Sequence, residues 1–100
     1  MLFANRIEPD SYLVPRFSPS ERVAFSREFG LRLQRLRVAA GLSQEYVAHQ
    51  AGLAVYTYRK FEKGESKPGT AANPGLYTLL ELADVFKISL GELLPLADKD

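Results

Sequence analysis

The 100-residue sequence contains no cysteine, which excludes a disulfide framework, thiol catalysis, an iron–sulfur cluster and any thiolate zinc site. Its single histidine, His49, excludes a metal site built from several histidines. The longest apolar run, residues 51–56, is far shorter than the ~20 residues that a membrane-spanning helix needs. Residues 1–10 lack a basic region followed by a continuous apolar core, so we expect no secretion signal and a soluble, cytoplasmic protein.

The sequence also lacks the residue combinations that catalysis needs. One histidine on a short predicted helix does not allow a nucleophile–histidine–acid arrangement, and no glycine-rich loop is suited to cradling a phosphate. We therefore predict a protein that is not an enzyme, holds no metal and uses no other cofactor.

The composition fits one small globular domain. Apolar residues make up 46% of the chain, enough to fill a single core, and charged residues make up an ordinary 25%. The net charge of +1 is unevenly distributed: residues 16–63 hold nine Lys/Arg against four acids, a net +5, whereas residues 64–100 carry −3. A basic middle region beside an acidic end favours a molecule that meets a polyanion with one face.

The chain divides into an arm, a helical domain and a tail. Residues 1–17 contain two prolines and scattered apolar side chains without a regular period, which predicts an irregular N-terminal arm. Because this arm is too apolar for a solvated tail, it is expected to lie on the domain or on a protein partner. The domain is predicted over residues 18–96, and residues 97–100 form a C-terminal tail.

The first helix has a clear start and end. Ser18-Pro19-Ser20-Glu21 combines an N-cap serine, a proline at the first helical position and a glutamate that can reach back to the cap. An apolar stripe at helical spacing then consists of Phe25, Phe29, Leu33, Leu36 and Ala40. Gly41 is expected to end the helix in the left-handed conformation.

Four shorter helices follow, and no strand is predicted. Ser43 caps a helix over residues 44–50, and a third helix over residues 55–62 is stopped by Gly64. Residues 65–73 read as a loop, Asn73-Pro74 opens a fourth helix that ends near Phe86, and Ser89-x-x-Glu92 opens a fifth. The predicted fold class is all-α, with five helices around one core.

The second and third helices, joined by a tight turn at Gly52, suggest a helix-turn-helix. Around them stand Gly41-Leu42-Ser43-Gln44-Glu45-x-x-Ala48, Ala51-Gly52-Leu53, Phe61-Glu62-Lys63-Gly64, Leu79-Leu80-x-Leu82-Ala83 and Ser89-Leu90-x-Glu92-Leu93-Leu94. In this combination and over residues 29–94, the chain resembles the phage-repressor and Cro-type (XRE) helix-turn-helix family. The resemblance implies a five-helix DNA-binding domain that regulates transcription as a homodimer on a near-palindromic operator. It also implies that the protein is associated with the nucleoid.

The resemblance also implies a role for each matching residue. The expected contacts with double-stranded DNA come from both helices of the motif: Ser43 and Gln44 to phosphates, Val55, Tyr56 and Lys60 to the bases, and Lys63 and Lys67 to the backbone. Arg59 neighbours the base-facing residues, and Thr57 is expected to meet either a phosphate or a base. Arg37 and Glu62 resemble a family pair that links the first helix to the third.

This sequence departs from the family pattern on the helix that reads DNA. Ala54 stands where a capping serine or threonine is usual, and Val55 and Tyr56 replace the usual polar readers, which predicts apolar contacts to bases. The apolar reading face and the apolar arm also support an alternative, in which the same fold is a protein-interaction module of antitoxin or adaptor type.

Overall fold

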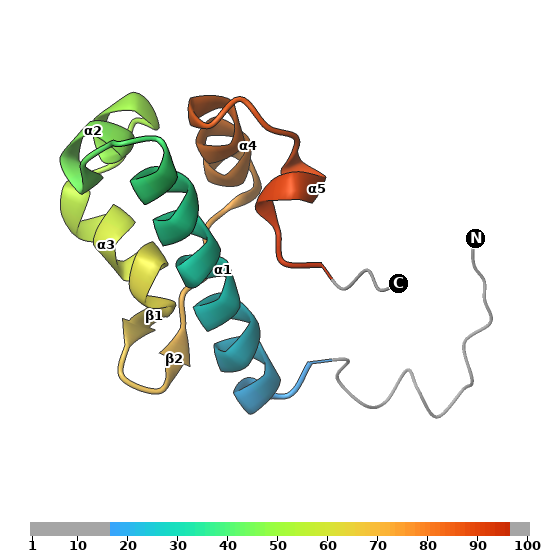
Figure 1. Cartoon of the computed structure of the whole chain (residues 1–100). Helices are drawn as coiled ribbons and strands as arrows, with labels where there is room; N and C mark the ends of the chain where they lie inside the picture. Colours follow the sequence, from blue (N-terminus) through green and yellow to red (C-terminus); the bar gives the residue numbers. More distant parts are fainter. Residues whose placement is uncertain (1–16, 97–100) are drawn as a thin grey trace.

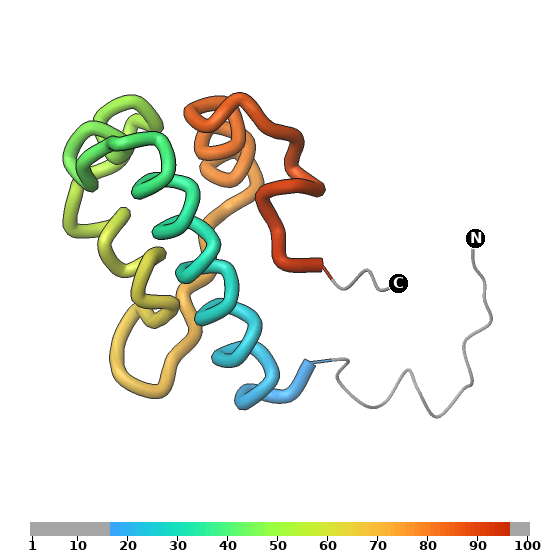
Figure 2. Tube along the Cα trace, viewed as in Figure 1, coloured from blue at the N-terminus to red at the C-terminus, as the bar shows by residue number. Residues whose placement is uncertain are grey.

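The computed structural model describes residues 17–96, which form five helices and one short hairpin (Figures 1 and 2). The helices are α1 (Pro19–Ala39), α2 (Gln44–Gln50), α3 (Val55–Lys63), α4 (Leu76–Val85) and α5 (Leu90–Leu93). Helices α2 and α3 lie on one side of the long α1, and α4 and α5 lie on the other (Figure 1). The predicted five-helix fold is confirmed, while the predicted arm and tail, apart from Phe17, lie outside the described residues.

Helix α1 begins and ends where the sequence predicts. The Ser18 side chain accepts a hydrogen bond from the Glu21 N–H (3.2 Å), and the Glu21 carboxylate accepts one from the Ser18 N–H (2.8 Å). At the other end Gly41 has φ of +72°, the left-handed conformation expected of it. Ala40, predicted as the last member of the apolar stripe, is instead the exposed C-cap residue. None of the helices within residues 17–96 combines the length and apolar character needed to cross a bilayer.

The predicted loop after α3 contains a short antiparallel hairpin, so the expectation of no strand was wrong. Strand β1 (Glu65–Lys67) pairs with β2 (Thr70–Ala71) through a turn at Pro68-Gly69, where Gly69 has φ of +80°. Pro followed by a left-handed Gly is the signature of a type II turn. Strands of three and two residues are too short to show an alternating pattern in the sequence.

The start of α4 was also predicted two residues too early. Gly75, which provides no side chain, occupies the N-cap position, and Asn73-Pro74 lies in the irregular segment before it. That segment is tied to the earlier chain, because the Ala72 N–H donates to the Gly64 carbonyl (2.9 Å). Helix α5, by contrast, has the predicted capping box of Ser89 and Glu92.

One core joins all five helices. Its buried members are Phe29 and Leu33 from α1, Val47, Ala48 and Ala51 from α2 and its C-cap, Tyr58 from α3, Leu82 and Ala83 from α4, and Leu93 from α5. The core therefore fixes α2 and α3 against α1 while the opposite side of α3 stays free of these contacts.

Gly30 explains how closely α1 and α3 approach. A Cβ atom at this position would lie 2.3 Å from the backbone oxygen of Glu62, a distance that side chains do not tolerate. Gly30 costs helix α1 about 1 kcal/mol relative to alanine, and in return the two backbones come into contact. The orientation of α3 is thus set partly by the absence of a side chain on α1.

Candidate nucleic-acid interface

The two sides of α3 differ in chemistry. Tyr58 is fully buried, and Glu62, the one acidic residue of α3, is turned inward with its side chain only 7% exposed. The outer side presents Tyr56, which is 67% exposed, together with Arg59, Lys60 and Lys63. Helices α2 and α3 form one edge of the molecule (Figure 1), so the side of α3 that does not pack on the core is open to a partner.

The carboxylate of Glu62 accepts four hydrogen bonds that join α1, α2 and α3. Arg37 donates two, from Nε (2.6 Å) and Nη2 (3.0 Å). The Tyr58 hydroxyl donates at 2.5 Å and the Gln44 Nε2 at 2.9 Å. Arg37 also donates from Nη1 to the Leu42 carbonyl (3.1 Å). The predicted pair of Arg37 and Glu62 is thus present, with side chains 14% and 7% exposed.

These contacts fix the protonation state of the cluster. Burial by itself raises the pKa of Glu62, but hydrogen bonds from Arg37, Tyr58 and Gln44 outweigh it and hold the pKa below its ordinary value of 4.5. Burial, reinforced by the bond to this carboxylate, raises the pKa of Tyr58 above 10.0. The hydrogen bond to Glu62 raises the pKa of Arg37. At neutral pH the cluster therefore holds a carboxylate, a guanidinium and a neutral phenol.

Gln44 and Arg59, both predicted DNA contacts, are joined by a hydrogen bond. Arg59 Nε donates to Gln44 Oε1 at 3.1 Å, so both polar atoms of the Gln44 side chain have protein partners. Arg59 Nη2 also pairs with Glu45 Oε2 at 3.1 Å, and these two side chains are 51% and 66% exposed. Sequence reasoning missed Glu45 and the Tyr58 hydroxyl, although the spacing of Tyr58 and Glu62, one helical turn, was a usable signal.

Tyr56 and Lys60 form a second unit on the outer side. The Lys60 ammonium lies 4.4 Å from the centre of the Tyr56 ring, a cation–π contact. Lys60 makes no ion pair with any residue of the described range 17–96. Val55 and Thr57 are half-buried, and Val55 packs against the core rather than standing free on the outer side as predicted.

The remaining predicted contacts lie at the two ends of the motif. Ser43 is exposed at the start of α2, where its hydroxyl oxygen accepts a hydrogen bond from the Tyr46 N–H (3.0 Å). Lys63 is exposed at the end of α3, and Lys67 is exposed on β1. Neither lysine forms an ion pair within the part of the chain that the structure describes.

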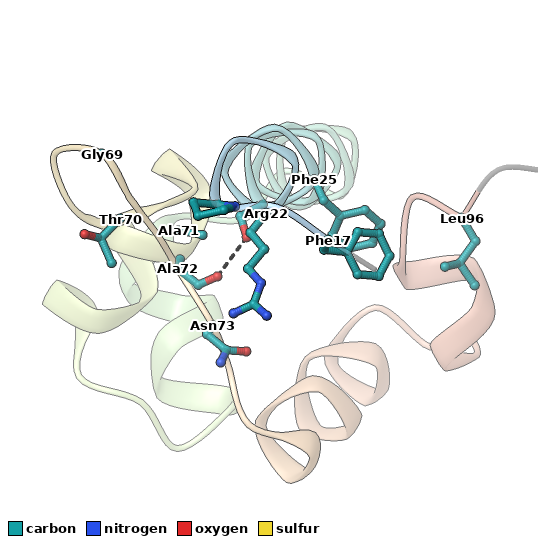
Figure 3. Close-up of a pocket in the computed structure, with 11 residues that line it drawn as sticks. Phe17, Arg22, Phe25, Gly69, Thr70, Ala71, Ala72, Asn73 and Leu96 are labelled. Atoms are coloured by element: carbon teal, nitrogen blue, oxygen red, sulfur yellow. Dashed lines mark hydrogen bonds between the residues drawn. The ribbon is translucent and has the colours of Figure 1, made fainter. Parts of the chain in front are cut away.

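A separate cleft of about 910 Å³ lies away from these residues (Figure 3). Its walls are the first turns of α1, the chain that returns from the hairpin, and Leu96. Phe17, Phe25 and Leu96 line it on one side, and the Arg22 guanidinium extends toward Asn73 (Figure 3). Ser26 closes one wall by donating to the Ala72 carbonyl at 2.8 Å. The cleft contains none of the predicted site residues. Residues 17–96 also hold no group of three or more His, Asp or Glu side chains placed to bind a metal ion.

The comparisons with known proteins agree with the helix-turn-helix arrangement of α2 and α3. A family model described as a helix-turn-helix domain matches residues 28–96. Among solved structures, the crystal structure of C.AhdI, a restriction-modification controller protein from Aeromonas hydrophila, is 37% identical in sequence. That similarity covers 71% of this chain and 98% of C.AhdI, with a TM-score of 0.61. No curated protein matches the chain.

Proposed function

The chain belongs to the helix-turn-helix family of the phage-repressor and Cro type, whose members are non-enzymatic DNA-binding proteins, and we propose that it regulates transcription as a dimer on a near-palindromic operator. In each half-site α3 lies in the major groove, with its first turns against the base edges.

One observation carries the proposal: the outward side of α3 has three cationic side chains, of which only Arg59 is paired with a carboxylate (Glu45 of α2), and the helix's only carboxylate is turned inward. DNA affinity depends on neutralising phosphates, so a carboxylate on this side would oppose binding. Glu62 does not oppose binding in this way, because its carboxylate is buried and forms an ion pair with Arg37.

The predicted residues take three roles in this proposal. Ser43 and Gln44 meet phosphates beside α2, Lys63 and Lys67 meet phosphates beyond the end of α3, and Tyr56 and Lys60 face the bases, with the half-buried Val55 and Thr57 beside them. Arg59 already holds Gln44 in place through a hydrogen bond. A side chain that is ordered before binding loses less entropy on contact with DNA, which favours affinity.

Exposed apolar side chains on α4 support the dimer. Leu76, Tyr77 and Leu80 are 57%, 78% and 43% exposed and share one face of the helix. Contiguous apolar surface of this kind commonly marks a protein–protein contact, and most soluble homo-oligomers are twofold dimers. Helix α4 lies across α1 from α3 (Figure 1), so such a contact leaves both α3 helices accessible.

The test is selection of bound sequences from a random duplex library by the full-length chain, followed by binding measurements at several salt concentrations. Each phosphate contact should contribute about 0.9 to the slope of log affinity against log salt, because bound counterions are released. Lys60→Met should reduce discrimination between the selected sequence and random DNA. Lys87→Met, a matched change at an exposed lysine on the α4 side, should leave both affinity and discrimination unchanged.

The dimer is tested by analytical ultracentrifugation of the wild-type chain and of Tyr77→Lys. The wild type should sediment as a dimer, and its selected operator should contain two half-sites about 34 Å apart, one turn of the duplex. A chain that enriches no sequence, or whose binding does not respond to salt, would contradict the proposed function and leave the protein-interaction hypothesis.

A further inference from the structure

Val55, Tyr56 and Lys60 were predicted to face the bases, and Thr57 to meet a base or a phosphate; the structure separates these side chains. Val55 packs against the core, Thr57 is half-buried, and neither projects far from the helix. Tyr56 is the most exposed large hydrophobic side chain of α3, and Lys60 lies one turn away on the same side. Any base contact made by the middle of α3 therefore depends chiefly on these two residues.

The Tyr56 ring and the Lys60 ammonium form one preassembled unit. At 4.4 Å from the ring centre, the ammonium lies within the range of a cation–π contact. This contact restricts the rotation of an aromatic side chain that is 67% exposed. The unit therefore presents a flat apolar surface directly beside a positive charge that has no ionic partner among residues 17–96.

Only some base edges match that combination. In the major groove, thymine carries the C5 methyl group, the one apolar group that a base pair displays there. Guanine displays two acceptors, N7 and O6, which suit a lysine ammonium. Among the groups displayed in the major groove, a thymine methyl next to a guanine edge is therefore the best match for an apolar ring with an adjacent ammonium.

We propose that Tyr56, held by Lys60, is a specificity-determining residue that reads a thymine methyl group beside a guanine in each half-site. This inference rests on the proposed function, because it names the DNA feature that the same surface recognises. Arg59, which is engaged by Gln44 and Glu45, has no part in this readout.

The experiment combines a change in the DNA with a change in the protein. Each thymine of the selected operator is replaced singly by deoxyuridine, which removes only the methyl group. In the wild type, replacement at one particular thymine position of a half-site should weaken binding about fourfold, the value of one buried methylene-sized group. In Tyr56→Ala the same replacement should have no effect, because the surface that contacts the methyl is gone.

Matched variants separate this contact from a general loss of binding. Tyr56→Phe keeps the ring and should keep the fourfold ratio. Lys63→Gln removes a proposed phosphate contact, so it should weaken binding to both DNAs and leave their ratio unchanged. Lys60→Met should reduce both the ratio and the penalty for replacing the neighbouring guanine by 7-deazaguanine. Thermal unfolding of Tyr56→Ala should match the wild type, since Tyr56 is exposed.

The outcomes distinguish this inference from the proposed function. If a sequence is enriched but no thymine-to-deoxyuridine change weakens wild-type binding, the inference is wrong and the DNA-binding function stands. The same conclusion follows if Tyr56→Ala retains the fourfold ratio. If no sequence is enriched, the proposed function fails first and this inference with it.

Discussion

The two sides of α3 differ in how their charged side chains are used. On the inner side, the Glu62 carboxylate is nearly fully buried and accepts hydrogen bonds from Arg37, Tyr58 and Gln44. On the outer side, Lys60 and Lys63 have no ionic partner among residues 17–96. The inner charges position the helix, and the outer ones remain available to a ligand. Changes on the inner side should therefore alter stability, and changes on the outer side should alter binding alone.

The largest expected effect on stability is that of Glu62→Gln. It leaves the guanidinium of Arg37, 14% exposed, without its counter-charge. Losing one partner of a buried pair costs about 3 kcal/mol or more, which urea denaturation would measure. Glu65→Gln is the matched control: the pair of Arg27 and Glu65 also ties α1 to the chain after α3, but its side chains are 61% and 21% exposed. Equal losses in the two variants would contradict the distinction.

A second variant tests the backbone contact between α1 and α3. In Gly30→Ala the new methyl group would lie 2.3 Å from the Glu62 carbonyl oxygen, so α3 must shift. Overpacking of this kind costs about 1–3 kcal/mol, and DNA binding should fall with it because the outer side moves as well. In Gly91→Ala the nearest atom would be 3.8 Å away, so its midpoint of denaturation should stay close to that of the wild type.

Acid should weaken the inner side selectively. Because the folded-state pKa of Glu62 lies below its ordinary 4.5, its carboxylate stabilises the fold above that pH. The contribution is lost as pH falls from 4.5 toward the folded-state pKa. Stability measured by denaturation between pH 7 and pH 3 should therefore fall less steeply in Glu62→Gln than in the wild type. Parallel curves for the two proteins would show that Glu62 does not titrate as described.

The smallest effect on stability is expected on the outer side. Lys63→Gln should change the free energy of unfolding by less than about 0.5 kcal/mol, because Lys63 is exposed and has no ionic partner in the described range. It should nevertheless lower the salt slope of DNA binding by about 0.9, the value of one lost phosphate contact. An unchanged slope would remove Lys63 from the interface.

Several elements were predictable because their causes are local. The starts of α1, α2 and α5 each depend on a serine whose oxygen accepts a bond from a residue three positions later. The start of α4 was mispredicted because the chain just before Asn73-Pro74 is tied at Ala72 to Gly64 and to Ser26 of α1, contacts that the local sequence does not show. The hairpin was missed for a different reason, because each strand is too short to show a period.

The sequence by itself determined the five helices and the family, because capping, periodicity and motif spacing act between residues close along the chain. Only the tertiary structure decided which of the predicted DNA contacts are free. It hydrogen-bonds Arg59 to Gln44 and to Glu45, and Gln44 to Glu62. It also packs Val55 inward and leaves Tyr56 and Lys60 paired on the outer side. The physical reason is that a hydrogen bond between helices depends on their relative placement. Here that placement is set by a shared core and by the missing side chain of Gly30.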